Sequence, residues 1–502
     1  MGWEAFRQSP SIPALPESPV VTTAKPSVLL VYPPISKLDR YGSELGVFGG
    51  KQIPLGVFYL AAYLRQLGYP VQALDAEARE LTSDDVVAEL RAGRYDVLGI
   101  SSTTVAFHRA LQLAQAVKES LPETVVVIGG PHVSSQPDQP LQHAAFDYAV
   151  PNEGEETLAE LLHVIAENGD PAGVRGLVYR RDGQVVVNPP RPYIADLDTL
   201  PFPAFDMIPD MRIYSPPPFN YQRLPVANIM TSRGCPNDCT FCENTTFGRQ
   251  FRIRSAASIV AEIELLMKRH GAREISFVDD TFTVRRSRIY EIFELARQRG
   301  LRFPWSCMSR INTVDEDLLR YMRDNGCWYI GFGVESADEQ ILKVIHKHIT
   351  PAGVERVVNI CHRLGIVTKG FFMIGHPLET VETIDKTIAF AKRIPLRHVV
   401  VTINTPMPGT EQYQHAREYG TLDESDWKRF NYWKPVFVPH GLTAELLLTK
   451  QQQFIREFYL RPRLLLRQLQ FAVSSPANLR QLGRIVTGSI RYVLRKRARC
   501  PG

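Results

Sequence analysis

The sequence predicts an α/β protein with a doubly wound domain of the flavodoxin or Rossmann type, then a partial (β/α)6 barrel, then a helical C-terminal region. Short β-branched runs alternate with amphipathic stretches of helical period, and the alternation occurs in two series. A chain of 502 residues also exceeds the ~100–200 residues that usually fold as one unit. We expect a disordered lead-in at 1–26, domains at 27–170 and 223–420, a linker with a hairpin at 171–222, and a basic helical region at 421–502.

The first series predicts a parallel sheet with helices on both faces. Its strands are expected at 28–32, 71–74, 97–101, 125–128 and 146–150. Ligands in such folds bind at the carboxyl ends of the strands. Small and hydroxylated residues there would let a large ligand approach the backbone: Ser101, Ser102, Thr103, Gly129, Gly130, His132, Glu153 and Gly154. Pro33-Pro34 stands where G-x-G-x-x-G would follow the first strand, so a dinucleotide is not expected.

The second series predicts the barrel. Its strands are expected at 227–231, 274–278, 303–308, 328–334, 367–374 and 399–403, with helical segments between them. Chemistry in such barrels is carried by the loops that follow the strands. Between the two series, Asp182-Gly183 predicts a tight turn that joins two short strands into a hairpin.

Three cysteines lie in the loop after the first barrel strand. Cys235, Cys239 and Cys242 form a C-x3-C-x2-C motif, and residues 1–234 contain no cysteine. Three thiolates at this spacing can bind three irons of a [4Fe–4S] cluster and leave the fourth iron open. A structural zinc site is the alternative, but it requires four ligands, and the nearest histidine is His270.

With an aromatic residue before the third cysteine, this motif resembles the radical S-adenosylmethionine superfamily, over residues ~223–420. The resemblance implies that the open iron binds S-adenosylmethionine, whose reductive cleavage yields a 5′-deoxyadenosyl radical. It also implies cofactor-binding roles for side chains at later strand ends: Asp279 and Asp280 toward the methionyl amine, Arg310 toward the carboxylate, and Glu335 and Ser336 toward the ribose. The alternative is that the aspartates cap a helix and Arg310 is a surface charge.

The first domain is similar to the cobalamin-binding domain of cobalamin-dependent radical S-adenosylmethionine enzymes, over residues ~27–165. The similarity rests on Gly129-Gly130-x-His132 and Glu153-Gly154-Glu155. It implies bound cobalamin, with the nucleotide tail beside the sheet near residues 101–104. The Asp-x-His-x-x-Gly motif of other cobalamin proteins is missing, so no axial histidine is expected. His132 is the one candidate, and a hydrogen-bonding role is its alternative.

The two resemblances imply an enzyme that abstracts hydrogen from an unactivated carbon and then transfers a methyl group from methylcobalamin. The alternatives are a radical cyclase or oxidase of a tetrapyrrole or lipid-like substrate, and a non-catalytic cobalamin or iron–sulfur sensor. A methylthiotransferase is not expected, because it carries a second cluster on cysteines of its front domain. The expected partners are a small, hydrophobic substrate and an external one-electron reductant, and no nucleic acid is expected.

Positive charge is concentrated at the C-terminus. Residues 456–502 contain eleven Lys or Arg against the single acid Glu457, and apolar residues recur at helical spacing over 479–494. Such a helix packs on the barrel or lies on an anionic membrane surface. No apolar run approaches the ~20 residues of a spanning helix. We therefore expect a cytoplasmic protein, with peripheral membrane contact through 456–502 as an alternative to packing.

Overall fold

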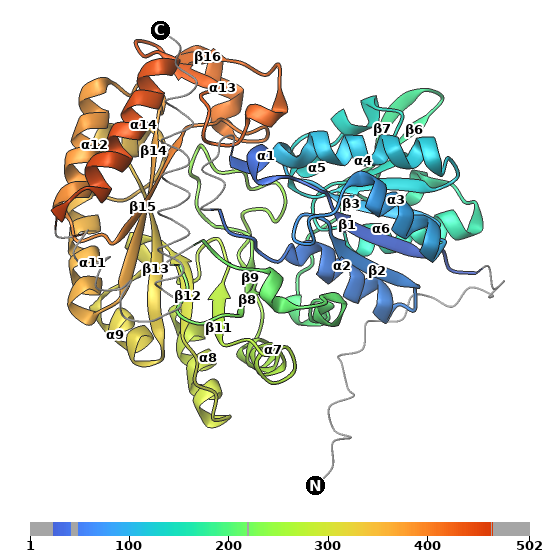
Figure 1. The fold of residues 1–502 in the computed structure, drawn as a ribbon, viewed down its shortest axis with the longest axis horizontal. Coiled ribbons are helices and arrows are strands. Elements are labelled where there is room, and N and C mark those ends of the chain that lie inside the picture. Colours follow the sequence, from blue (N-terminus) through green and yellow to red (C-terminus); the bar gives the residue numbers. More distant parts are fainter. Residues whose placement is uncertain (1–23, 42–48, 218–219, 463, 465–502) are drawn as a thin grey trace.

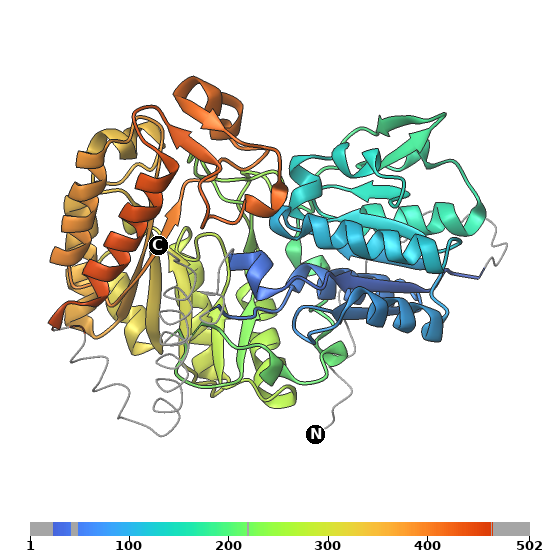
Figure 2. The same ribbon diagram turned by 45° about the horizontal axis from the view of Figure 1, so that its top comes forward.

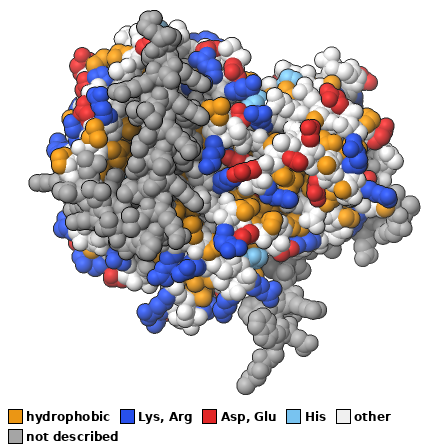
Figure 3. Space-filling view, in the orientation of Figure 1, with side chains coloured by type: hydrophobic (Ala, Val, Ile, Leu, Met, Phe, Trp, Pro, Cys, Tyr) orange, Lys and Arg blue, Asp and Glu red, His pale blue; other side chains and the backbone are white. Residues whose placement is uncertain are grey.

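The computed structural model describes residues 24–41, 49–217, 220–462 and 464. Two sheets lie side by side in it, the N-terminal one blue to cyan and the C-terminal one green to orange (Figures 1 and 2). The predicted class and the order of the two α/β parts are confirmed. Basic and acidic side chains are interspersed over the described part of the face in Figure 3.

The first sheet has the order β2-β1-β3-β4-β5-β6-β7. Its first five strands are parallel: β1 (Val28–Tyr32), β2 (Val71–Asp75), β3 (Val97–Ser101), β4 (Val125–Gly129) and β5 (Tyr148–Val150). One face packs against α2 (Leu55–Gln66) and α6 (Glu155–Glu167), and the other against α3 (Ser83–Gly93) and α4 (Phe107–Ser120). β1 is buried at every position, because it is covered on both faces, as its continuous apolar sequence predicts.

The predicted hairpin is present, as β6 (Val178–Arg181) and β7 (Gln184–Val187). Its turn residues Asp182 and Gly183 both have positive φ, which suits a tight hairpin turn. We expected this hairpin within a linker, but it extends the first sheet, because β6 pairs antiparallel with β5. An unpaired β5 edge would otherwise expose backbone donors and acceptors.

The second sheet has the order β15-β14-β13-β12-β11-β8, with every pair parallel. β8 and β15 are its two edges, so the described strands form an open barrel. The strands are β8 (Val226–Ile229), β11 (Glu274–Phe277), β12 (Trp305–Ser309), β13 (Cys327–Glu335), β14 (Val367–Ile374) and β15 (His398–Ile403). The long helices between them are α7 (Ala256–Arg269), α8 (Arg286–Gln298), α9 (Glu316–Asp324), α11 (Pro351–Leu364) and α12 (Val381–Arg393).

The C-terminal region is less helical than expected in its described part. After α13 (Glu411–Tyr419), two short antiparallel strands, β16 (Gly420–Leu422) and β17 (Phe437–Pro439), precede α14 (Ala444–Tyr459). Gly420 permits the pairing, because a Cβ there would lie 2.1 Å from the Val438 carbonyl oxygen. α14 packs on the barrel beside α12 and β15. The amphipathic helix expected near 479–494 lies outside the described residues, as does most of the expected disordered lead-in.

None of the helices in the described ranges is both long and apolar enough to cross a membrane. The remaining α-helices and strands are short: α1 (Lys37–Tyr41), α5 (Pro131–Ser135), α10 (Glu339–Val344), β9 (Ser232–Arg233) and β10 (Arg252–Ile253). Of these, β9 and β10 frame the three predicted metal ligands.

Candidate functional site

The three cysteines lie in one loop with a defined base. β9 and β10 pair antiparallel, with Arg252 opposite Arg233, and the loop between them runs from 234 to 251. We call this segment the cysteine loop and the two strands its stem. Gly234 opens the loop with φ +82°, and a Cβ there would lie 2.2 Å from the Gln250 carbonyl oxygen. Only glycine fits that position without movement of the backbone.

The thiols border a cavity of about 260 Å³ at the carboxyl ends of the barrel strands. Arg310 Nη1 lies 3.0 Å from Cys239 Sγ, and Asn237 Nδ2 lies 3.2 Å from Cys235 Sγ. A hydrogen bond from Cys242 and the charges of Lys347 and Arg310 lower the pKa of Cys239 to about 5. Cys239 therefore favours the thiolate, which is the form that binds metals, whereas the hydrogen bond to Cys239 and desolvation raise the pKa of Cys242.

All three thiols border this one cavity. In the described part of the chain, no group of three or more Cys, His, Asp or Glu side chains that could hold one metal ion is found. A zinc ion needs its ligands to converge on one point, whereas the three thiolates of a [4Fe–4S] cluster each bind a different iron. The cluster prediction requires three cysteines that border one cavity, and Cys235, Cys239 and Cys242 do so.

The two predicted aspartates point in different directions. Asp279 is buried, and its Oδ1 accepts hydrogen bonds from Thr231 N at 3.1 Å, Thr231 Oγ1 at 2.8 Å and the Ser232 hydroxyl. It braces the end of β8 and does not border the cavity. Asp280 does border the cavity, and desolvation together with the charges of Asp279 and Glu243 raises its pKa.

The other barrel residues also separate into two groups. Arg310 and Glu335 border the cavity, and Glu335 accepts a hydrogen bond from Lys347 Nζ at 2.7 Å. Glu335 sits at a β-bulge with φ +62°, a conformation that turns its carboxylate toward the cavity. Ser336 is buried away from it, 3.2 Å from the Thr387 hydroxyl. The carboxylate of Asp280 and the guanidinium of Arg310 give the cavity groups complementary to an amino-acid zwitterion.

A second cavity, of about 510 Å³, lies at the carboxyl ends of β1, β3, β4 and β5. Ser101, Gly129, Gly130, Glu153 and Gly154 border it. Gly130 has φ +94°, and a Cβ there would lie 2.8 Å from the Ser102 backbone, so the wall depends on glycine. A large, mainly apolar space with a glycine wall fits the nucleotide tail of cobalamin. Ser102 is buried beneath the wall, and neither it nor Thr103 borders this cavity.

His132 is fully buried and does not border this cavity. Its ring nitrogens contact Thr104 Oγ1 at 3.2 Å and Gln139 Oε1 at 3.0 Å, and the ring packs on Phe107. Burial lowers the pKa of His132 to about 4. Both ring nitrogens are engaged within the protein, as the hydrogen-bonding alternative expects.

Lys347 is a cavity residue that the sequence analysis missed. It pairs with Glu335, and its ammonium lies 5.5 Å from the centre of the Phe241 ring in the cysteine loop. Lys347 follows α10 and not a strand, so it could not be predicted from the rule that functional residues lie in the loops after strands. Asn237 was also missed, although its place inside the cysteine motif could have identified it.

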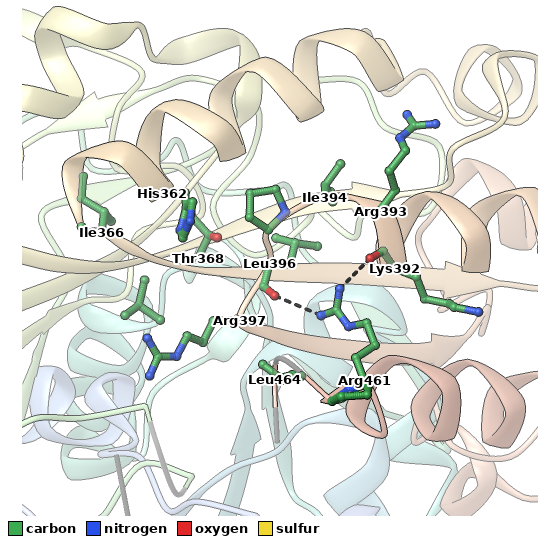
Figure 4. A pocket seen from close by; sticks show the side chains of 14 residues that line it. His362, Ile366, Thr368, Lys392, Arg393, Ile394, Leu396, Arg397, Arg461 and Leu464 are labelled. Atoms are coloured by element: carbon green, nitrogen blue, oxygen red, sulfur yellow. Dashed lines mark hydrogen bonds between the residues drawn. The ribbon is translucent and has the colours of Figure 1, made fainter. Parts of the chain in front are cut away.

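A larger cavity, of about 660 Å³, lies at the amino ends of β14 and β15, where the residues after α14 meet the barrel (Figure 4). Arg461 crosses it and donates to the carbonyl oxygens of Lys392 at 2.7 Å and Leu396 at 3.3 Å (Figure 4). Lys392 and Arg393 are already paired with Glu457 and Glu355. This cavity lies at the opposite ends of the strands from the barrel cavity, and Arg461 ties the residues after α14 to the barrel there.

Comparison with known proteins agrees with both parts of the chain. Residues 229–391 match the radical SAM superfamily, and residues 45–162 match the B12 binding domain. An uncharacterized methyltransferase of Pyrococcus horikoshii, PH0819, is 33% identical over 444 residues, which cover 88% of this chain and 94% of the relative. An anaerobic magnesium-protoporphyrin IX monomethyl ester cyclase of Rubrivivax gelatinosus is 29% identical over 441 residues, which cover 86% of this chain and 77% of the cyclase.

Solved structures share the fold. The cobalamin-dependent S-adenosylmethionine radical enzyme OxsB, with aqua-cobalamin and S-adenosylmethionine bound, gives a TM-score of 0.70 at 17% identity, over 86% of this chain and 66% of that one. The radical S-adenosylmethionine methyltransferase TsrM of Kitasatospora setae gives 0.65 at 19% identity, over 88% and 90%.

The chain belongs to the cobalamin-dependent radical S-adenosylmethionine enzymes. The predictions of an enzyme and of three cofactors, a [4Fe–4S] cluster, S-adenosylmethionine and cobalamin, are confirmed at the level of this family. The sensor alternative finds no support among these relatives.

Proposed function

We propose that this enzyme transfers a methyl group to a carbon atom of a small, hydrophobic molecule. The observation that carries the proposal is that one loop borders both cavities. Cys235, Cys239 and Cys242 border the barrel cavity, while Thr246 and Phe247 of the same loop border the cavity of the first domain. Ligands in the two cavities would therefore lie on either side of a single segment, where a substrate can meet both.

Different barrel residues would bind the cluster and the separate groups of S-adenosylmethionine. Cys235, Cys239 and Cys242 would bind three irons. Asp280 would accept hydrogen bonds from the methionyl ammonium, and Arg310 would pair with its carboxylate. Glu335, held by Lys347, would accept a hydrogen bond from a ribose hydroxyl. Asp279 and Ser336 would not contact the cofactor. They would fix the backbone that carries their neighbours Asp280 and Glu335.

In the first domain, Ser101, Gly129, Gly130 and Gly154 would line the seat of the nucleotide tail of cobalamin. The unit at 27–170 would be completed by the β6–β7 hairpin, which covers the edge of its sheet. When bound, the cluster with S-adenosylmethionine supplies radical chemistry and cobalamin supplies methyl transfer. The residues named above would orient these groups.

Two further features support the partners expected from the sequence, a hydrophobic substrate and an external one-electron reductant. Met308 and Phe371 give the barrel cavity an apolar side, which suits a hydrophobic substrate. Cys242 is exposed, so the cysteine loop is accessible to an external one-electron donor.

Anaerobic turnover with S-adenosylmethionine carrying a trideuterated methyl group tests the reaction. The reconstituted full-length protein, a chemical reductant and a pool of hydrophobic metabolites are incubated together, and products are identified by mass spectrometry. We expect a product that carries the labelled methyl group and that is missing with Cys239→Ser protein. A product that is cyclised or oxidised without the label would contradict methyl transfer and favour the cyclase alternative.

We also propose peripheral membrane contact through 456–502, supported by the eleven basic residues there. Because α14 packs on the barrel through Phe454 and Phe458, the test is a truncation after Leu464, which leaves α14 whole. The full-length protein should sediment with anionic liposomes at low salt and be released at high salt, since such attraction is screened within a Debye length of ~10 Å. Equal sedimentation of the truncated protein would contradict this proposal.

A further inference from the structure

Two carboxylates and two guanidinium groups join the first domain to the stem of the cysteine loop. Glu153, after β5, lies 2.9 Å from Arg233 Nη1 and 2.9 Å from Arg252 Nη1. Glu155, the first residue of α6, lies 2.6 Å from Arg233 Nη2. We call these four residues the interdomain clamp. Arg233 and Arg252 come from β9 and β10, so one carboxylate of the first domain holds both strands of the stem.

The clamp is isolated from water and held by aromatic rings. Its four side chains are each 5% exposed or less. Arg233 lies over the rings of Tyr59 and Phe247, at 5.4 and 5.1 Å, and Arg252 lies over Tyr193 at 5.0 Å. The charges balance, and a buried charge that loses its partner is strongly destabilised. The stem therefore has one favoured position relative to the first domain.

The clamp also forms part of the wall of the first-domain cavity. Glu153, Glu155, Arg233 and Phe247 all border it. Glu153 further accepts a hydrogen bond from Ile194 N at 2.7 Å, so the segment after the hairpin is fastened to the same carboxylate. A molecule that fills this cavity would touch the groups that hold the cysteine loop.

We propose that Glu153 is a positioning residue that couples occupancy of the first-domain cavity to the order of the cysteine loop. Glu153 borders the cavity, and its two oxygens are engaged by Arg233, Arg252 and the Ile194 amide. A ligand packed against this wall restricts the clamp, and the restricted stem holds the three thiols in place. Coupling is reciprocal, so an ordered loop also strengthens binding in the cavity. The proposal rests on the proposed function for the identity of the ligand, whereas its test reads loop order alone.

Hydrogen exchange measured by mass spectrometry on the full-length protein tests this coupling, with hydroxocobalamin as the probe. In wild type, hydroxocobalamin should slow exchange in peptides from 234–251. In Glu153→Gln, exchange there should be at least about tenfold faster, and hydroxocobalamin should no longer slow it. The matched control is Glu160→Gln on α6, whose side chain pairs with Arg191 outside the clamp. It should behave as wild type.

Arg252→Lys is the second variant, because it keeps the charge but loses the planar fork and the contact with the Tyr193 ring. As in Glu153→Gln, hydroxocobalamin should slow exchange in the cysteine loop less than it does in wild type.

A response in both variants equal to that of wild type would overturn the proposal. Collapse of both variants, seen as loss of the near-ultraviolet circular dichroism, would also overturn it, since the clamp would then be core and not a coupling device. A protein that shows the coupling but no methyl transfer would contradict only the proposed function.

Discussion

Neighbouring residues at a strand end serve different purposes here, and the two aspartates after β11 illustrate this. Asp279 Oδ1 accepts three hydrogen bonds from Thr231 and Ser232, whereas Asp280 faces the barrel cavity. Asp279→Asn should lower the free energy of unfolding by about 1–3 kcal/mol, the usual cost of disturbing a buried hydrogen-bonded group. Asp280→Asn should leave stability unchanged and weaken S-adenosylmethionine binding, measured by calorimetry on reconstituted protein. The reverse pattern would contradict these assignments.

His132 makes stability depend on pH. Burial lowers the pKa of His132 from 6.5 to about 4. Between pH 6.5 and pH 4, the imidazole therefore binds a proton in the unfolded chain but not in the folded protein. Stability should therefore fall as the pH falls from 6.5 to 4, by up to about 3 kcal/mol at ~1.4 kcal/mol for each unit of pKa. Urea unfolding at both pH values should show a smaller fall for His132→Gln, which does not titrate. An identical fall in the two proteins would exclude His132 as the cause.

Cys239 has the most protected thiol of the loop, with Arg310 beside it. Cys239→Ser should lose the cluster, because only two cysteine ligands remain in the loop. Iron analysis after anaerobic reconstitution measures this, with Cys500→Ser as the control outside the loop. Retention of the full iron content by Cys239→Ser would show that the cluster does not use this residue.

At the scale of elements, the sequence predicts what local patterns determine. The strands of both sheets follow from continuous apolar runs, and β14 has the predicted bounds. The stem strands β9 and β10 were not predicted, because each has two residues and the pairing spans the cysteine loop. Three buried cations could not be predicted for a similar reason. In sequence they resemble ordinary surface charges, and only tertiary contacts bury them: Arg233, Arg252 and Lys347.

α14 should stabilise the barrel as an element. Phe454 is fully buried, and its ring lies 5.1 Å from that of Phe372 in β14. Phe454→Ala should lower the free energy of unfolding by about 3–5 kcal/mol, since it removes a large side chain and leaves a cavity. Gln453→Ala, one residue earlier on the same helix, should have an effect within about 0.5 kcal/mol. Chemical unfolding distinguishes the two, and equal effects would mean that α14 is not docked as described.

At the scale of the whole molecule, two sheets bring their carboxyl-end cavities to one shared segment, the cysteine loop. The barrel places thiols on one side of this loop, the first domain places a glycine-walled cavity on the other, and the interdomain clamp fixes their relation. Neither domain alone would define that relation, because Glu153 follows β5 of the first sheet and Arg233 lies in the stem of the cysteine loop. This explains why the two cofactor sites could be predicted separately from sequence, while their juxtaposition could not.

One chain should hold both metal cofactors, the cluster on the three cysteines and cobalamin in the first domain. The most direct measurement is the iron and cobalt content of a single preparation, reconstituted anaerobically with iron, sulfide and hydroxocobalamin and then desalted. We expect about four irons and one cobalamin for each chain. The cobalamin spectrum should be base-off, because the nucleotide tail would occupy the first-domain cavity, and it should show no protein imidazole on cobalt, because His132 is engaged within the protein. A preparation that retains zinc in place of iron, or no cobalt, or a spectrum with a protein imidazole bound to cobalt, would contradict it.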